Sequence, residues 1–218
     1  IGRVVDYDTY RKVTKENQIE ITLPKWYGVE QTAEDITRMK EWIAAVAGAK
    51  QTEDVAVYDV DYESPSDLID SLHAAGRVVI CYFSAGSWED YRPDAGDFPE
   101  AVKGSPLDPP FADELWIDIR AQSVRDIMMT RLDLAAQKGC DAVEPDNVDG
   151  YANDNGFNLS AADQLDFNRF IADEAHLRGM SVGLKNDTDQ LGDLVGDFDW
   201  ALNEECYSYD ECDLYTPT

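Results

Sequence analysis

Short apolar runs alternate along the chain with longer segments whose apolar positions recur at helical spacing. Glycine and polar residues separate the two kinds of segment, so the pattern predicts strands alternating with helices. The predicted strands are residues 3–8, 19–23, 55–61, 78–83, 115–119, 141–146, 181–185 and 200–204. The predicted helices are residues 32–47, 66–75, 123–138 and 161–178. Ser66 and Ser160 are the expected N-caps of two of these helices, Ser160 with Asp163 three residues later.

Near-continuous apolar strands that alternate with helices indicate a parallel sheet covered by helices. Eight such strands favour a closed TIM-type (β/α)8 barrel over an open sheet. No stretch rich in Pro, Gly or Ser divides the chain, so we expect residues 1–218 to form a single domain. The 218 residues fall short of the ~250 typical of this barrel, so short connections or an incomplete barrel are expected.

The charge balance excludes one class of function and leaves two explanations open. The chain has 45 acidic and 18 basic residues and a formal net charge of −27. Nucleic-acid binding needs clustered Lys and Arg, so it is disfavoured. The excess acid either forms a solvated surface or attracts a cationic substrate. With 44% hydrophobic residues the chain can build a core, and no apolar run reaches the ~18 residues of a membrane span.

Polar and ionisable residues follow most of the predicted strands directly. In a parallel barrel these strand ends meet on one face, where the catalytic groups of the fold lie. Polar residues follow strands in many proteins because loops are exposed to solvent. Ionisable or polar residues after six strands in succession, however, favour a functional site. The residues concerned are Asp59, Asp61, Ser84, Asp118, Glu144, Asp146, Asn147, Lys185, Asn186, Asn203, Glu204 and Glu205.

Several carboxylates with little His allow three kinds of chemistry: glycoside hydrolysis, divalent-metal catalysis or passive cation binding. Metal catalysis is less favoured because no His lies at a strand end. The Asp-rich tract 146–150 also has Phe157 where a calcium loop needs Glu. Ser84 lacks the context of a serine nucleophile. No glycine-rich phosphate loop follows a strand, and we expect no cofactor.

The four cysteines divide into two groups. Cys81 and Cys140 lie in apolar, strand-like segments and are interpreted as lone thiols that pack as small hydrophobic residues. Cys206 and Cys212 lie in a polar, aromatic stretch and are a candidate disulfide, which would indicate an oxidising compartment.

Four ordered blocks resemble the signature of glycoside hydrolase family 114, the endo-α-1,4-polygalactosaminidases. They are VVICYFSAGSWEDYRPD from residue 78, DAVEPDNVDGY from residue 141, GLKN from residue 183, and NEEC from residue 203 followed by Glu211-Cys212. The resemblance covers residues 55 to 218, whereas residues 1–54 align poorly. The last family strand, expected after Cys212, is missing. Residues 2–10 resemble it, as they would in a permuted chain.

The resemblance implies a (β/α) barrel that hydrolyses α-1,4 linkages in galactosamine-rich polysaccharide with retention. It assigns Asp146 as nucleophile and Glu204 as acid/base, although the two roles could be exchanged. It places substrate-binding residues at Asp59, Tyr82, Ser84, Glu144, Asn147, Lys185, Asn186 and Glu205. The implied protein is secreted and monomeric, and its partner is a cationic or partly acetylated aminosugar polymer. The alternatives are a carbohydrate-binding barrel without catalysis and an extracellular structural barrel.

Overall fold

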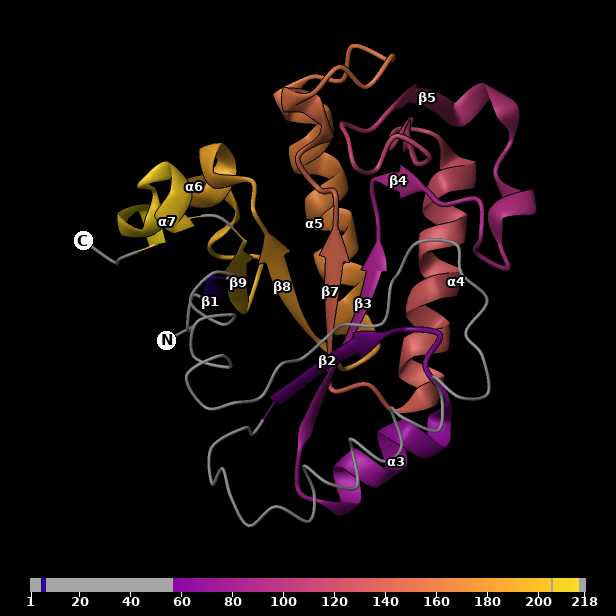
Figure 1. Ribbon diagram of the computed structural model, residues 1–218, viewed down its shortest axis with the longest axis vertical. Helices are drawn as coiled ribbons and strands as arrows, with labels where there is room; N and C mark the ends of the chain where they lie inside the picture. The colour runs from indigo at the N-terminus through magenta and orange to yellow at the C-terminus, as the bar shows by residue number, and fades with distance from the viewer. Residues whose placement is uncertain (1–4, 7–56, 205, 216–218) are drawn as a thin grey trace.

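The computed structural model describes residues 5–6, 57–204 and 206–215, and its centre is a parallel sheet (Figure 1). Six strands lie in the order β1-β9-β8-β7-β3-β2, and every neighbouring pair is parallel. Their bounds are β1 Val5–Asp6, β2 Val57–Asp61, β3 Val78–Ser84, β7 Ala142–Asp146, β8 Ser181–Lys185 and β9 Trp200–Asn203. The parallel α/β class predicted from the sequence is confirmed. The predictions at residues 19–23 and 32–47 lie outside the described residues.

Three long helices flank the sheet, and α4 and α5 run beside each other along the strands (Figure 1). The helices are α3 Ser66–Ala74, α4 Gln122–Lys138, α5 Ala161–Leu177, α6 Leu191–Leu194 and α7 Cys206–Tyr209. Five 3-10 helices are η1 Ala95–Asp97, η2 Glu100–Val102, η3 Gly150–Ala152, η4 Thr188–Gln190 and η5 Cys212–Tyr215. Among the helices of the described part, none is long and apolar enough to cross a membrane.

Local sequence explains where α5 begins and where α4 ends. Ser160 accepts a hydrogen bond from the backbone of Asp163, and Asp163 accepts from the backbone of Ser160, so the predicted capping box of α5 is confirmed. Gly139 ends α4 in the left-handed conformation, at φ 87°, that glycine adopts without strain. The expectation for Ser66 is wrong: Pro65 occupies the N-cap position of α3 and Ser66 is the first helical residue.

The core lies between the sheet and the helices. Alternate residues of β3, Val79, Cys81 and Phe83, are fully buried, as the two-residue period of a strand requires. Met128 of α4 and Ile171 of α5 are fully buried in the same cluster. This packing fixes the helices against the strands and thereby fixes the direction of the strand ends.

The predicted barrel strand at 115–119 is wrong. Residues Leu115–Ile117 form β6, the centre of a separate antiparallel sheet between β4 Ser87–Trp88 and β5 Lys103–Pro106. This insertion follows β3 and lies near the arrowheads of β3 and β7 (Figure 1). An apolar run of this length reads the same in either kind of sheet, so the run alone could not assign it.

Two disulfides are present, one expected and one not. Cys206–Cys212 closes a six-residue separation near the end of the chain and confirms the candidate bridge. Cys81 of β3 is bonded to Cys140, which lies just before β7 and 59 residues later in the sequence, so the interpretation of these cysteines as lone thiols is wrong. Because β3 pairs with β7, the Cα atoms of the two cysteines lie 5.9 Å apart, and the linear sequence does not reveal this proximity.

Strand β1 pairs in parallel with β9, with Val5 opposite Leu202. Part of the tract 2–10 therefore lies beside β9, where the resemblance would place the strand that follows it. A first strand beside a last strand is also found in any closing barrel, so permutation stays a prediction.

Candidate active site

A buried lysine on β8 joins carboxylates from its two neighbouring strands, β7 and β9, at the carboxyl end of the sheet. The ammonium of Lys185, on β8, lies 2.6 Å from Glu144 and 3.5 Å from Asp146, both on β7. It also lies 3.4 Å from Glu204, which directly follows β9. Lys185 is only 4% exposed, so its charge is balanced by protein carboxylates and little by solvent. Burial opposes the charged form of Lys185, but these carboxylates raise the lysine pKa overall.

The shared lysine limits the distance between Asp146 and Glu204. One oxygen of each carboxylate lies within hydrogen-bonding or near-contact distance of the same ammonium, so these oxygens cannot be farther apart than the two distances together. That limit admits the ~5–5.5 Å separation between the two carboxyl groups of retaining glycosidases. The two acids, 58 positions apart in the printed sequence, therefore face a common space.

Asp146 is fixed by two donors. The hydroxyl of Tyr82 donates to its Oδ2 at 3.1 Å, and the backbone N–H of Asn147 donates to its Oδ1 at 2.8 Å. The strand register explains the first contact, because β3 and β7 pair with Ser84 opposite Asp146 and Tyr82 two residues earlier on the same face. The side chain of Asp146 is 17% exposed, so it is held but still reachable.

Glu144 and Asp59 form a hydrogen-bonded pair of unlike protonation. Burial raises the pKa of Asp59, on β2, well above its ordinary value, and the adjacent Glu144 raises it further. Burial also opposes ionisation of Glu144, but Lys185 and the hydrogen bond from Asp59 lower its pKa overall. A hydrogen bond between two carboxyls needs a proton, and these opposite pKa directions favour its place on Asp59, with Glu144 facing Lys185.

Glu204 is the more open of the two facing acids, with a side chain 47% exposed. Burial is the largest influence on it and raises its pKa; Lys185 opposes this and Asp146 adds to it. Asn186 contacts it twice, since its Nδ2 donates to Glu204 Oε2 at 3.3 Å and its Oδ1 accepts from the Glu204 backbone N–H at 3.2 Å. A carboxyl with a raised pKa is suited to donate a proton near neutral pH.

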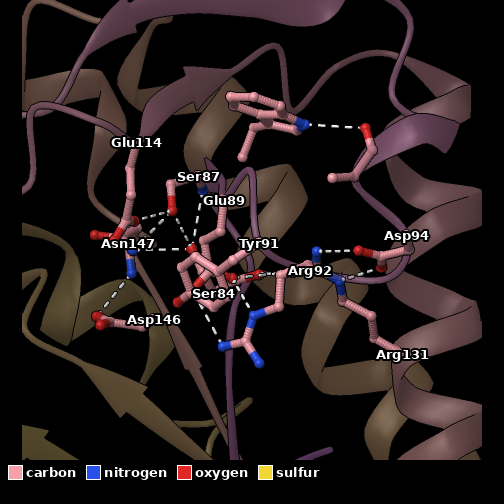
Figure 2. Close-up of polar contacts among 12 residues, drawn as sticks. Ser84, Ser87, Glu89, Tyr91, Arg92, Asp94, Glu114, Arg131, Asp146 and Asn147 are labelled. Atoms are coloured by element: carbon pink, nitrogen blue, oxygen red, sulfur yellow. Dashed lines mark hydrogen bonds and ion pairs between the residues drawn. The ribbon is translucent and has the colours of Figure 1, made fainter. Parts of the chain in front are cut away.

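A second polar cluster lies on the insertion side of Asp146 (Figure 2). The amide of Asn147 donates to Ser84 Oγ at 2.9 Å, and Ser84 Oγ lies 2.6 Å from Ser87 Oγ. Ser87 Oγ in turn donates to Glu114 at 2.8 Å. Burial raises the pKa of Glu114 to about 7, although the bond from Ser87 opposes this. Glu114 therefore brings a further acid, from the loop before β6, towards the same end of the sheet.

Two buried arginines anchor the insertion to the strand ends (Figure 2). Arg92 pairs with Glu89 at 2.7 Å and with Asp61, at the end of β2, also at 2.7 Å. Arg131 of α4 pairs with Asp94 at 2.7 Å and donates to the backbone carbonyl of Ser84 at 2.7 Å. Removal of one partner from such buried pairs is costly, so the network fixes the position of the insertion.

Most predicted site residues meet at this end of the sheet. The structure brings together Asp59, Tyr82, Glu144, Asp146, Asn147, Lys185, Asn186 and Glu204. Ser84 lies there too, but it is fully buried beneath Asn147. Glu205 lies outside the described residues. Their contact with a substrate stays a prediction.

The strand-end rule also gave one wrong residue and missed others. Asp118 belongs to the antiparallel insertion and pairs with Arg120, away from Lys185. Glu114 precedes a strand instead of following one, so the rule could not find it. Asp149 lies within the DNVDG tract but does not directly follow a strand, so the rule does not find it; burial raises its pKa to about 6, with Asp146 adding to this. Tyr215 carries no signal in its local sequence.

Within the described ranges no group of three or more His, Cys, Asp or Glu side chains is arranged to hold a metal ion. The two histidines pair with Asp141 and Asp199, each at 2.9 Å. The arrangement at Lys185 is thus two facing carboxyls held by a cation and by hydrogen-bond donors.

The sequence of the chain matches a known protein family. The sequence model of glycoside-hydrolase family GH114 matches residues 26–218. The chain belongs to family GH114. The match starts at residue 26, so the family resemblance extends beyond the expected range of 55–218. No curated protein matches the chain.

Solved structures agree with the GH114 assignment. The crystal structure of Aspergillus fumigatus Ega3 in complex with galactosamine is 47% identical and has a TM-score of 0.72. The match covers 76% of this chain and 66% of the Ega3 chain, so the GH114 chain described here spans slightly less than two thirds of that relative.

Two more distant structures share the fold alone. The glycoside hydrolase domain of PelA from Pseudomonas aeruginosa is 14% identical with a TM-score of 0.52, over 70% of this chain and 67% of that one. A variant of trehalulose synthase MutB is 11% identical with a TM-score of 0.53, and the match covers 81% of this chain and 46% of the MutB chain. The GH114 chain therefore has the fold of TIM-barrel glycosidases, with a parallel sheet of which six strands are described.

Proposed function

We propose that this protein is a retaining endo-glycosidase that hydrolyses α-1,4 linkages in galactosamine-rich polysaccharide. One observation carries the proposal: in a GH114 chain, Asp146 and Glu204 lie on the same buried ammonium at distances that allow the separation of a retaining pair. Because the chain spans 66% of the Ega3 chain, activity is proposed for the residues present and is not transferred from Ega3.

Asp146 is the proposed nucleophile. Two donors fix its oxygens, and Lys185 lies beside it, so an ionised carboxylate can be held in one orientation. Its carboxylate oxygen attacks the anomeric carbon while the bond from that carbon to the glycosidic oxygen breaks. The product is a glycosyl ester on Asp146 and a departing sugar hydroxyl.

Glu204 is the proposed acid/base. Its raised pKa favours the protonated form, from which it gives its proton to the departing oxygen in the first step. It then accepts a proton from a water that attacks the ester, which releases the sugar and restores Asp146. Its greater exposure suits a group that must reach both a leaving group and a water. Lys185 keeps the net charge of the paired acids low enough for both to work at close range.

The substrate class follows from charge and from the relative. Ega3 was crystallised with galactosamine, whose amine is a cation when it is not acetylated. The net charge of −27 and the acids at the strand ends would attract such a polymer. Two disulfides support a secreted location, because such bonds persist in oxidising compartments. We further propose that the protein acts as a monomer.

The Asp146→Asn and Glu204→Gln variants test the proposal. Each replaces a carboxyl with an amide of the same shape, so we expect the release of reducing ends from a galactosamine polymer to fall by at least ~10³-fold. Asp154→Asn is the matched control, since it removes an exposed carboxylate with the same change in charge and should retain wild-type activity.

Retained hydrolysis in either site variant would contradict the assignment of its residue. Polymer binding by the wild-type protein without any rise in reducing ends would instead indicate a carbohydrate-binding barrel. If the wild-type protein neither hydrolysed nor bound the polymer, the result would indicate a structural barrel.

A further inference from the structure

The proposed acid/base is held by a side chain that is itself held from the end of the chain. Asn186 contacts Glu204 with both ends of its amide, at 3.3 Å and 3.2 Å. Its own backbone is in the left-handed region at φ 49°, and its N–H donates to the carbonyl of Leu202 at 2.8 Å. The orientation of the Glu204 carboxyl thus depends on where Asn186 is placed.

Tyr215 links this asparagine to the following segment. Its hydroxyl donates to the backbone carbonyl of Asn186 at 3.2 Å and accepts from Asn203 Nδ2 at 3.1 Å. Asn203 Nδ2 also donates to Glu211 at 2.7 Å, and Asn203 is only 1% exposed. A buried asparagine at the end of β9 and a hydroxyl from η5 therefore brace the strand end that bears Glu204.

A disulfide closes the segment that supplies these groups. Cys206 and Cys212 are bonded, and the backbone N–H of Glu211 donates to the carbonyl of Cys206 at 2.9 Å. Leu214 donates to the carbonyl of Glu211 at 3.0 Å, which continues the chain into η5 and Tyr215. The bridge therefore fixes Glu211 and Tyr215 relative to Asn203.

We propose that segment 206–215, which the Cys206–Cys212 bridge closes up to residue 212, positions the acid/base, with the Tyr215 hydroxyl acting on Glu204 through Asn186. This rests on the proposed function, in which Glu204 transfers the proton. Tyr215 is a positioning residue: within the described structure its hydroxyl contacts Asn186 and Asn203 and not a carboxyl of the site. Loss of the hydroxyl should therefore change proton transfer more than substrate binding.

The sign of the pH effect follows from the Asn186 bond. A donor to Glu204 favours its ionised form, so loosening Asn186 should raise the Glu204 pKa. The charged groups that also face Glu204 are Lys185 of β8, Asp146 and Glu144 of β7, and Asp149 beyond β7. A change at Tyr215 leaves all four in place. The acid must be protonated, so the alkaline fall of kcat/KM should move to higher pH.

The experiment compares Tyr215→Phe with Tyr209→Phe. Tyr209 lies in the same disulfide-closed segment but is 69% exposed, so its variant should match wild type. For Tyr215→Phe we expect kcat to fall ~10-fold, KM to stay within about twofold, and the alkaline limb to rise by up to ~1 pH unit. The proposal would be overturned if kcat and the alkaline limb of the kcat/KM pH profile stayed unchanged, or if only KM rose.

A double-variant cycle tests the route through Asn186. Asn186→Gly removes the amide while tolerating the positive φ. If Tyr215 acts through Asn186, adding Tyr215→Phe to Asn186→Gly should lower kcat by less than about twofold more. If Tyr215→Phe lowers kcat in the Asn186→Gly background as much as it does in the wild-type background, the route through Asn186 is contradicted. The Cys206→Ala/Cys212→Ala variant should reproduce the kcat loss and limb shift of Tyr215→Phe; wild-type kinetics in that variant would overturn the role of the disulfide.

A readout without catalysis separates this proposal from the proposed function. NMR titration of carbon-13-labelled Glu204 in wild type and Tyr215→Phe should show the pKa rise whether or not the protein hydrolyses any polymer. No hydrolysis by wild type with the pKa rise present would leave the positioning intact and reject the enzyme. Normal hydrolysis with no pKa rise would reject the positioning.

Discussion

Glu144 illustrates how single side chains set the charge of this site. Its carboxylate lies 2.6 Å from Lys185 and is almost entirely buried, so the pair is stabilised only while both partners remain. Asp59 completes the group as a protonated acid, because burial and the nearby Glu144 raise its pKa. Asp59 is therefore the member of this group that donates a hydrogen bond to Glu144 as a neutral acid.

Replacing Asp59 tests this protonation state. Asp59→Asn keeps a neutral donor towards Glu144, so we expect kcat/KM within about threefold of wild type and a loss in free energy of unfolding under ~1 kcal/mol. Asp59→Ala removes a hydrogen bond to a charged group, and the loss should be ~2 kcal/mol. Urea unfolding at neutral pH together with kinetics would check both; equal damage from Asn and Ala would show that Asp59 is not a neutral donor.

For single residues, the sequence predicted which ones gather at the carboxyl end of the sheet but not how they pair. Asp146, Lys185 and Glu204 were found because each ends or follows an apolar run, and parallel strands bring such ends together. That Lys185 contacts all three acids depends on strand order, which places β8 between β7 and β9. Tyr215 and Glu114 escaped prediction because their roles depend on loops whose paths local sequence does not determine.

Among the elements, strand β3 contributes to the site in several ways. It supplies Tyr82 and Ser84, pairs with both β2 and β7, and carries the unexpected Cys81–Cys140 bridge. The continuous apolar run at 78–83 located β3 correctly, and buried and half-buried positions alternate along most of it. Periodicity could not assign the run at 115–117 to an antiparallel sheet or reveal the bridge, because both depend on contacts between segments distant in sequence.

The two disulfides should differ in their effect on stability. Cross-links stabilise more when they close longer loops, and the separations are 59 residues for Cys81–Cys140 and 6 for Cys206–Cys212. We expect Cys81→Ala/Cys140→Ala to lose ~4 kcal/mol of unfolding free energy and Cys206→Ala/Cys212→Ala to lose ~2 kcal/mol. Urea denaturation of the two double variants measures this. A larger loss from the short bridge would contradict the loop-length argument.

For the whole molecule, the family match and the fold agree. The GH114 match covers residues 26–218, and six of the described strands form a parallel sheet with several ionisable groups at its carboxyl end. The fold class was predictable from the alternation of strands and helices, and the family from four sequence blocks. The net charge of −27 suits a cationic polymer but would equally suit a solvated surface, so charge alone could not choose between these explanations.

The most direct test of the central claim is the stereochemistry of hydrolysis. Proton NMR of an α-1,4-linked galactosamine oligosaccharide, recorded during the first minutes of cleavage by the wild-type protein, identifies the anomer released first. If Asp146 and Glu204 act on one anomeric centre through a covalent ester, the α-anomer is released first and the β-anomer grows only by mutarotation. Release of the β-anomer first would show a single displacement by water and contradict the account.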